Sequence, residues 1–493
     1  MYRNEFEETP DNINELLQRY ENYLIGQESN GLDEEDFEVI INYYDDAEDI
    51  KKALEVAENA SKALPYAVLL KLKKADLLIA VNRYNQALRA LDEAEVLDSL
   101  DYNIVLLRMD AYYGLNKQKT ALEVFNNALP KFIGEDKVEL LLEASEIFDE
   151  QEDFDGVFDC LKFTLQEDPN NEEALHKICY WTEYTFRYEE SLIIHQEITE
   201  KYPYNELAWF NIGCCYQGLK FYEKAIDAYS FATAIDDDFT FAHRNIADAY
   251  MRLRKYQDAL NCLLLVNTQT NNEVEILAAI AYCYQKLNDF NNARKFCKQA
   301  LLINPQDTEL LYKIGCTYMG QNNWSSALKY LNQAITFYSQ KATYYNAIGQ
   351  CNFSLGNYGL AIDNFAEAVR LKPKWKIAWK DFLTAYYEID EFEMCITLIK
   401  LAQLQFAKPE ISFEFLRVAC LYLTGDIKES ISLLETILPN NQKHLSKLLK
   451  ICPEILENNS ILHIINSHVK QKRIKNKQSK KNNNRDDNFD RPF

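Results

Sequence analysis

The sequence predicts an all-α fold, a solenoid of about twelve helix-turn-helix units of 34 residues each. Apolar residues make up 47% of the 493 residues, while only 13 glycines and 11 prolines are present, which is a balance typical of helices. A pattern of apolar and small residues recurs with a period of 34 residues, and the prolines respect the same period. Stacked units also explain how so long a chain buries its apolar residues without one oversized core.

The clearest unit begins at Glu206 and predicts two amphipathic helices. The first apolar stripe consists of Trp209, Ile212, Gly213 and Tyr216, and the second of Ala225, Tyr229 and Ala232. Both stripes follow the three- and four-residue spacing of one helix face. The small residues Gly213 and Ala225 allow the two helices to approach closely.

Units of the same pattern recur along the chain. Besides Glu206, they begin at Glu34, Val68, Tyr102, Val138, Glu172, Thr240, Val274, Thr308, Ala342, Lys376 and about Ile411. The register slips by two residues at 136–137 and by one near Glu410. The predicted array therefore spans 34–444. Val157, Cys395 and Ser430 stand where alanine is expected, and we expect the close helix contact to accept them.

Proline placement supports this register independently, because proline breaks helix interiors but suits the joint after a helix. Position 32 of a unit is occupied by Pro65, Pro169, Pro203, Pro305 and Pro373, and positions 29 to 34 by Pro130, Pro409 and Pro439. No proline falls inside a predicted helix of the array.

The repeated pattern resembles the consensus of the tetratricopeptide repeat (TPR) family from about Glu34 to His444. The resemblance implies a right-handed α–α superhelix whose first helices line a concave groove. In the family this groove accepts an extended peptide or a helix, chiefly through positions 2, 5, 9, 12 and 13. The resemblance thus implies a non-enzymatic scaffold or adaptor that binds a protein or peptide ligand.

Mapping those positions onto this chain predicts two unlike surfaces. The candidate partner-binding groove contains Tyr180, Tyr184, Phe210, Phe241, Arg244, Arg252, Tyr282, Lys286, Tyr312 and Phe353. An acidic stripe, suited to basic segments, contains Glu139, Glu146, Asp149 and Glu150. Exposed aromatic residues beside arginines dominate interface energies. The alternative is that several of these aromatic side chains pack against a neighbouring repeat.

The two ends of the chain depart from the repeat pattern. Residues 1–33 contain one amphipathic stripe from Ile13 to Leu24, with Pro10 at its start, and are expected to form an N-terminal capping helix. Residues 445–469 are expected to form two short capping helices separated at Pro453. Residues 470–493 are too polar to fold alone and are expected to be a disordered basic tail.

Charge is divided unevenly between the body and this tail. The net charge is −23, and the tail carries nine Lys or Arg against three Asp or Glu, so the remaining body stands at −29. An acidic body disfavours nucleic acid and anionic membranes. Two alternatives stay open: the tail associates with nucleic acid or an anionic membrane surface, or it occupies the acidic groove and regulates it.

No motif predicts catalysis. Phosphate-binding loops, nucleophile elbows and zinc-protease helices lack their signatures, and we expect no catalytic residue, cofactor or metal. The twelve cysteines are scattered without a C-x-x-C motif, and both the Cys214–Cys215 pair and the grouping of Cys452 with His463 and His468 are interpreted as packing. The chain lacks a signal peptide and a membrane-length apolar run, which predicts a cytoplasmic protein.

Overall fold

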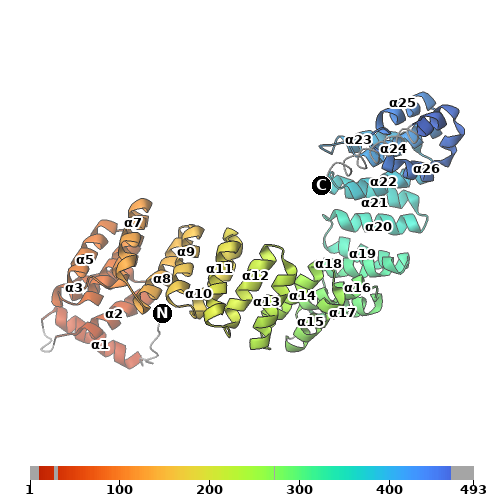
Figure 1. The fold of residues 1–493 in the computed structure, drawn as a ribbon. Helices are drawn as coiled ribbons and strands as arrows, with labels where there is room; N and C mark the ends of the chain where they lie inside the picture. Colours follow the sequence, from red (N-terminus) through yellow and green to blue (C-terminus); the bar gives the residue numbers. More distant parts are fainter. Residues whose placement is uncertain (1–9, 27–30, 271, 468–493) are drawn as a thin grey trace, which may run out of the picture. The chain divides into compact units, whose positions relative to one another are not determined.

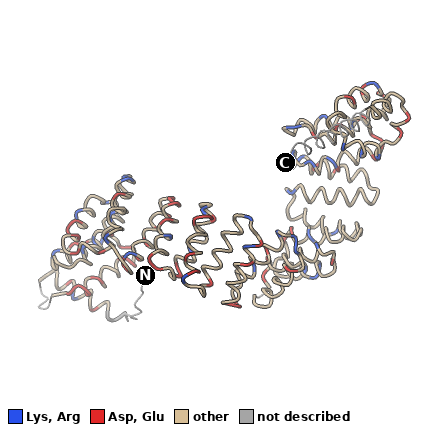
Figure 2. Tube along the Cα trace, viewed as in Figure 1, with Lys and Arg blue, Asp and Glu red and all other residues tan. Residues whose placement is uncertain are grey.

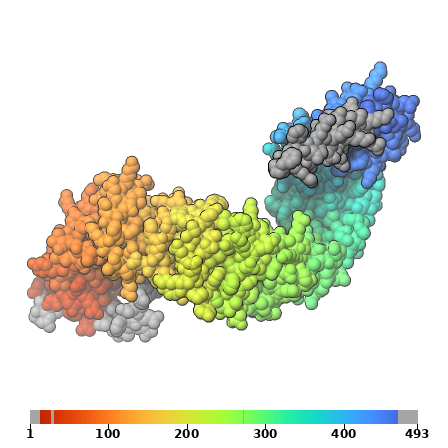
Figure 3. Space-filling view, viewed as in Figure 1, coloured from red at the N-terminus to blue at the C-terminus, as the bar shows by residue number. Residues whose placement is uncertain are grey.

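The computed structural model describes residues 10–26, 31–270 and 272–467, which form helices and short connections (Figure 1). The predicted all-α solenoid is confirmed. The chain divides into two compact units, Met1–Arg254 and Lys255–Phe493. Within each unit, successive helices lie side by side, and their side chains fill the space between them (Figure 3).

The first unit contains the helices up to α14. Their bounds are α1 (Pro10–Leu24), α2 (Glu34–Asp46), α3 (Ile50–Ala63), α4 (Val68–Ala80), α5 (Tyr84–Leu97), α6 (Tyr102–Gly114), α7 (Gln118–Ala128), the 3₁₀ helix η1 (Leu129–Lys131), α8 (Glu135–Glu150), α9 (Phe154–Glu167), α10 (Glu172–Thr185), α11 (Tyr188–Lys201), α12 (Glu206–Gly218), α13 (Tyr222–Ile235) and α14 (Thr240–Arg252).

The second unit contains the helices from α15 onward. Their bounds are α15 (Tyr256–Gln269), α16 (Val274–Lys286), α17 (Phe290–Ile303), α18 (Thr308–Gly320), α19 (Trp324–Phe337), α20 (Ala342–Ser354), α21 (Tyr358–Leu371), α22 (Lys376–Glu388), α23 (Phe392–Gln403), α24 (Ile411–Leu423), α25 (Ile427–Ile437), η2 (Gln442–His444), α26 (Leu445–Ile451) and η3 (Pro453–Glu457). A last helical stretch covers residues 459–467.

The expected unit starts coincide with the first residues of helices, with one exception. α8 begins at Glu135 rather than at Val138, because the two inserted residues extend its first turn. Gly134 precedes it with a φ of 61°, a conformation that glycine adopts freely. Lys137, one of the inserted residues, forms an ion pair with Glu167 at 2.5 Å. The insertion therefore lengthens a helix instead of opening a loop.

The turn inside each helix pair has one recurring backbone conformation. Residue 15 of every unit has positive φ: Glu48, Asn82, Asn116, Glu152, Phe186, Lys220, Arg254, Asn288, Asn322, Gly356, Asp390 and Gly425. In most of these turns the following N–H donates to the carbonyl of residue 11, as from Arg83 to Leu78 (2.7 Å) and from Phe221 to Tyr216 (2.8 Å). This is the Schellman way of ending a helix. The first helices therefore stop at residue 13 of their units, except α10, which runs one residue further.

Close contact between paired helices depends on a small residue at position 20. That position is buried in every unit, including where the alanine is replaced. Ser430 Oγ donates to the Val418 carbonyl (2.9 Å), and Cys395 Sγ lies 3.6 Å from the Leu383 carbonyl oxygen. The substituted polar atoms thus find partners on the facing helix.

One helix pair differs from its neighbours. α10 and α11 approach each other less closely than α12 and α13 do. The interface between α10 and α11 carries polar side chains that are fully buried: Thr182 donates to Ser191 (2.9 Å), and His195 is 0% exposed. Neither ring nitrogen of His195 has a hydrogen-bond partner among the described residues. Polar packing replaces apolar packing in this repeat.

Apolar side chains from outside the predicted array lie against its first and last repeats. Tyr20 of α1 is buried and contacts the ring of Phe37 edge-on at 6.2 Å. At the other end, Leu448, Ile455 and Ile461 are fully buried in a cluster with residues of α24 and α25. The predicted tail, 470–493, and the alternatives that depend on it lie outside the described residues.

None of the helices in the described part of the chain combines the length and apolarity that crossing a bilayer requires. The cytoplasmic location stays a prediction.

Candidate functional site

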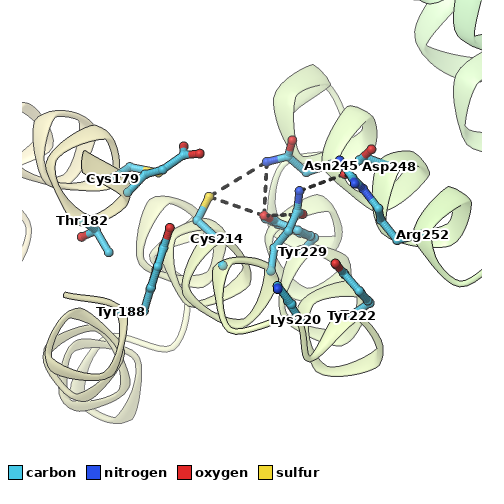
Figure 4. Close-up of a pocket in the computed structure, with 13 residues that line it drawn as sticks. Cys179, Thr182, Tyr188, Cys214, Lys220, Tyr222, Tyr229, Asn245, Asp248 and Arg252 are labelled. Atoms are coloured by element: carbon cyan, nitrogen blue, oxygen red, sulfur yellow. Dashed lines mark hydrogen bonds and ion pairs between the residues drawn. The ribbon is translucent and has the colours of Figure 1, made fainter. Parts of the chain in front are cut away.

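The first helices of consecutive pairs in the N-terminal unit surround a polar cavity of about 310 Å³ (Figure 4). Its lining comes mainly from α10, α12 and α14, with Tyr188, Lys220, Tyr222 and Tyr229 closing it from the second helices and turns. Cys179 and Thr182 stand on one side, Asn245 and Arg252 on the other, in the view of Figure 4. The repeat geometry therefore converges polar groups from three neighbouring units on one place.

A chain of hydrogen bonds fixes the polar side of this cavity. The Tyr229 hydroxyl accepts from Asn245 Nδ2 (3.2 Å) and donates to Gln217 Oε1 (3.1 Å). Gln217 Nε2 in turn donates to Asp248 Oδ2 (3.1 Å), which also pairs with Arg252 Nε at 3.4 Å. Because Tyr229 is 1% exposed, its hydroxyl is an immobile anchor for the chain. The outermost member, Arg252, keeps its guanidinium largely in solvent.

The Cys214 thiol, which lines the cavity, is a poor nucleophile because its pKa is raised. A hydrogen bond with Cys179, together with burial, holds the pKa of Cys214 well above its usual value. The Cys214 sulfur also lies 3.5 Å from the Tyr229 hydroxyl. Cys215 is buried away from the cavity, and burial raises its pKa to about 12. Since the thiolate is the nucleophile, this pair is suited to packing rather than to reaction.

α10, which supplies part of the cavity lining, also carries exposed aromatic side chains. Tyr180 is 61% and Tyr184 49% exposed. They form a cluster with Trp181 and Phe154, in which the Phe154 ring lies 4.7 Å from Tyr184 and 5.4 Å from Trp181. The ring contacts hold two exposed tyrosines in place, so little entropy is lost if a ligand covers them.

The other predicted groove residues of this unit differ in exposure. Phe241 is 66% exposed and Arg252 is exposed. Phe210 is half-buried against the rings of Phe239 (5.0 Å) and Tyr229 (5.5 Å). Arg244 is half-buried as well. Phe210 therefore packs against aromatic rings of its own repeat, whereas Phe241 stays exposed.

In the C-terminal unit, the predicted groove residues contact side chains of their own repeat or of the adjacent one. Tyr312 is half-buried against Tyr344 (5.0 Å), and burial raises the pKa of its hydroxyl. The Lys286 ammonium lies 5.1 Å from the centre of the Tyr282 ring. Phe353 lines a cavity of about 370 Å³ whose other walls include Trp324, Phe365, Gln350 and Asp381.

The predicted acidic stripe lies on α8. Glu139, Glu146, Asp149 and Glu150 are all exposed, and Glu146 pairs with Lys177 at 3.2 Å. Acidic residues are also spread along the neighbouring helices (Figure 2). Among the described residues, no group of three or more His, Cys, Asp or Glu side chains is arranged to hold a metal ion.

Comparison with known proteins identifies the repeat. A sequence model described as tetratricopeptide repeat matches residues 72–136 and 312–374, and a second model of the same description matches 207–239 and 274–307. The chain is a tetratricopeptide repeat protein. These four matches fall on helix pairs in both units. Proteins of this family are generally non-enzymatic scaffolds, and the repeats here indicate a scaffold for protein interaction.

Solved TPR structures resemble this protein at low identity. The APC/C hetero-tetramer Cut9–Hcn1 is 12% identical over 79% of this chain and 97% of that one, with a TM-score of 0.39. A TPR protein from Parabacteroides merdae ATCC 43184 is 16% identical over 50% and 98%, with a TM-score of 0.39. YrrB, described as having an unusual peptide-binding site, is 16% identical over 37% and 95%, with a TM-score of 0.33. No curated protein matches the chain at a significant level.

Sequence reasoning about this TPR protein missed several residues on the face of the first helices. Asp76 and Asp110 occupy position 9 of their units, two repeats and one repeat, respectively, before the unit in which Glu146 occupies it. With Glu143 they line a further cavity, described below. Reading position 9 down successive repeats, as Asn42, Asp76, Asp110 and Glu146, would have extended the acidic stripe beyond α8.

Proposed function

We propose that this TPR protein binds a peptide or helical segment of a partner protein on the face of its first helices, centred on α10, α12 and α14. The supporting observation is that Tyr180, Tyr184 and Phe241 expose large aromatic surface on α10 and α14, two of the helices that line the cavity. Such side chains bury large rigid areas, and arginine makes directed charge-assisted bonds.

The chemistry of the cavity favours a ligand with hydrogen-bonding groups. Asp248 and Arg252 form one end of a fixed polar chain, so an incoming backbone or side-chain amide meets both an acceptor and a donor. The flanking tyrosines offer apolar faces with polar tips. An extended or helical peptide presents both kinds of group at once.

Affinity purification with the full chain as bait, followed by mass spectrometry, provides the partner for the test. Charge reversal at Arg244 and Arg252 is expected to weaken capture while helicity by circular dichroism stays unchanged. The double change Tyr180→Ala and Tyr184→Ala is expected to weaken it as well.

Tyr66→Ala is the matched control, because Tyr66 is 81% exposed but lies in the turn between α3 and α4. Its loss is expected to leave capture unchanged. Full capture by the Arg244 and Arg252 variant, or equal loss with Tyr66→Ala, would remove the support for this face.

A further inference from the structure

A second cavity on the first helices of the N-terminal unit has an apolar floor. It measures about 360 Å³ and is bordered by α4, α6 and α8. Its apolar lining consists of Leu69, Leu72, Leu106, Leu107 and Ile147. Leu69 and Leu107 are only half-buried, so part of the floor is open to solvent. Aliphatic side chains left in contact with water favour any ligand that covers them.

Carboxylates stand around this floor. Asp76 comes from α4, Asp110 from α6, and Glu143 and Glu146 from α8. Asp76, Asp110 and Glu143 form no hydrogen bond or ion pair within the described part of the chain. Burial, with Glu150 and Asp76 nearby, raises the pKa of Asp110 to about 6. These acids repel one another, and although the charge of Lys73 lowers the pKa of Asp76, burial outweighs it and the pKa is raised.

The two nearest cations leave this imbalance in place. Lys73, which also lines the cavity, donates from Nζ to Asn42 Oδ1 at 3.0 Å. Lys177 lies on α10, beyond the cavity, and is shared between Glu146 (3.2 Å) and Glu173 (2.6 Å). One lysine at one end of the cavity therefore faces four carboxylates.

We propose that this cavity binds a Lys/Arg-rich segment of a partner protein that carries leucine-like side chains among its cations. The inference rests on the proposed function, that the first helices bind peptides, and it adds the partner's chemistry at a site separate from the α10–α14 face. The cations pair with the carboxylates of α4, α6 and α8, and the apolar side chains cover Leu69 and Leu107.

The apolar floor distinguishes this occupant from other cations. A polyamine would pair with the carboxylates but leave the leucine side chains exposed to water. A divalent metal needs several oxygens converging on one point, and no such group occurs among the described residues. A nucleic acid would be repelled by the same carboxylates. Only a peptide supplies spaced cations and aliphatic groups together.

The test uses the full chain and a short fluorescent peptide in which Lys and Leu residues alternate, measured by fluorescence anisotropy. A second peptide has Ser in place of every Leu. We expect the Lys/Leu peptide to bind more tightly than the Lys/Ser peptide, and spermine to compete weakly. Equal binding of the two peptides, or full displacement by spermine at equal charge, overturns the proposal.

Two sets of variants locate the binding. Asp110→Asn with Glu143→Gln is expected to weaken the Lys/Leu peptide by about tenfold, since partly buried charge pairs carry that much coupling. The control, Glu55→Gln with Glu123→Gln, removes the same charge from position 22 of second helices, where both residues are exposed. We expect it to change affinity less than twofold. Equal loss in both overturns the site.

A third variant separates the contribution of the apolar floor to peptide binding from that of the carboxylates. Leu107→Ser is expected to weaken the Lys/Leu peptide and to leave the Lys/Ser peptide unchanged, with helicity checked by circular dichroism. If partner capture ignores the α10–α14 changes but the Lys/Leu peptide still depends on Asp110 and Glu143, the proposed function fails while this inference stands.

Discussion

Gly213 lies directly beneath the ring of Tyr229, and a Cβ at Gly213 would come within 2.4 Å of two ring carbons. The ring is buried between the two helices of its repeat, where α12 and α13 approach most closely. The hydroxyl on that ring anchors the hydrogen-bond chain that runs through Gln217 to Asp248. One absent methyl group thus sets both the packing of the repeat and the polar side of the cavity.

Gly213→Ala is therefore expected to destabilise the protein by about 1–3 kcal/mol, because the buried ring must move to admit the methyl group. Thermal unfolding followed by circular dichroism measures the loss. Gly359→Ala is the matched control: it lies in α21 with open space around it, and alanine there is expected to be neutral or slightly stabilising. Equal stability of the Gly213 variant and the native chain would contradict the close packing.

Phe186 holds a left-handed backbone conformation (φ 59°) in the turn after α10, where four other repeats have asparagine. Its side chain is 74% exposed, so little packing is lost on substitution. Phe186→Asn is expected to stabilise the protein by about 1 kcal/mol, since asparagine tolerates this conformation and phenylalanine does not. The reverse change in a matching turn, Asn322→Phe, should lower the melting temperature.

His195 occupies position 24, where Leu91, Leu161, Leu263 and Leu331 stand in other repeats. It is fully buried, and its ring nitrogens find no hydrogen-bond partner among the described residues. His195→Leu is expected to stabilise the protein by about 1–3 kcal/mol, because an unsatisfied buried polar group is removed. His176→Leu, at an exposed position of α10, should bring no such gain in denaturant unfolding.

The same histidine makes stability depend on pH. Burial lowers the pKa of His195 to about 3 from the ordinary value of 6.5. As the pH falls from 6.5 toward 3, the unfolded chain takes up a proton that the folded chain refuses, so stability present above pH 6.5 is lost. The slope is at most about 1.4 kcal/mol per pH unit. His195→Leu should flatten this slope in urea unfolding at pH 7, 6 and 5; an unchanged slope would contradict it.

Asp110 affects the pH dependence of stability in the direction opposite to that of His195. Its pKa is raised to about 6 from 3.8, mainly by burial, so the folded chain binds a proton more readily than the unfolded chain. The stability that this proton adds is present below pH 3.8 and is lost as the pH rises through 6. At pH 7, Asp110→Asn is expected to add about 1 kcal/mol, a value reduced by the water that still reaches the carboxylate.

This gain from Asp110→Asn should disappear by pH 4. The control is Asp227→Asn on α13, where the side chain is exposed. A gain at pH 4 equal to that at pH 7 would show that repulsion among the carboxylates of α4, α6 and α8 is not its source.

Local patterns in the sequence determined the helix register. The spacing of Trp209, Ile212 and Tyr216 predicts one helix face, and the positions of the prolines predict where pairs are joined. Both the apolar spacing and the proline positions depend on residues within a few helical turns of one another. They can therefore be read without knowing which helices pack against them. For the same reason the sequence placed Tyr180 and Arg252 at groove positions of first helices; that both side chains are exposed is seen only in the structure.

Contacts between neighbouring helices determined which groove side chains stay exposed and where cavities form. Phe210 and Tyr312 stand at groove positions of their units, as Tyr180 and Phe241 do, yet aromatic residues of adjacent elements cover them. The cavity of α4, α6 and α8 likewise exists only because leucines and carboxylates from three units meet. Burial and charge repulsion depend on distances between side chains that are about 34 residues apart in sequence. Periodicity determines which face a residue occupies, but only the packed neighbours determine how much of it remains exposed.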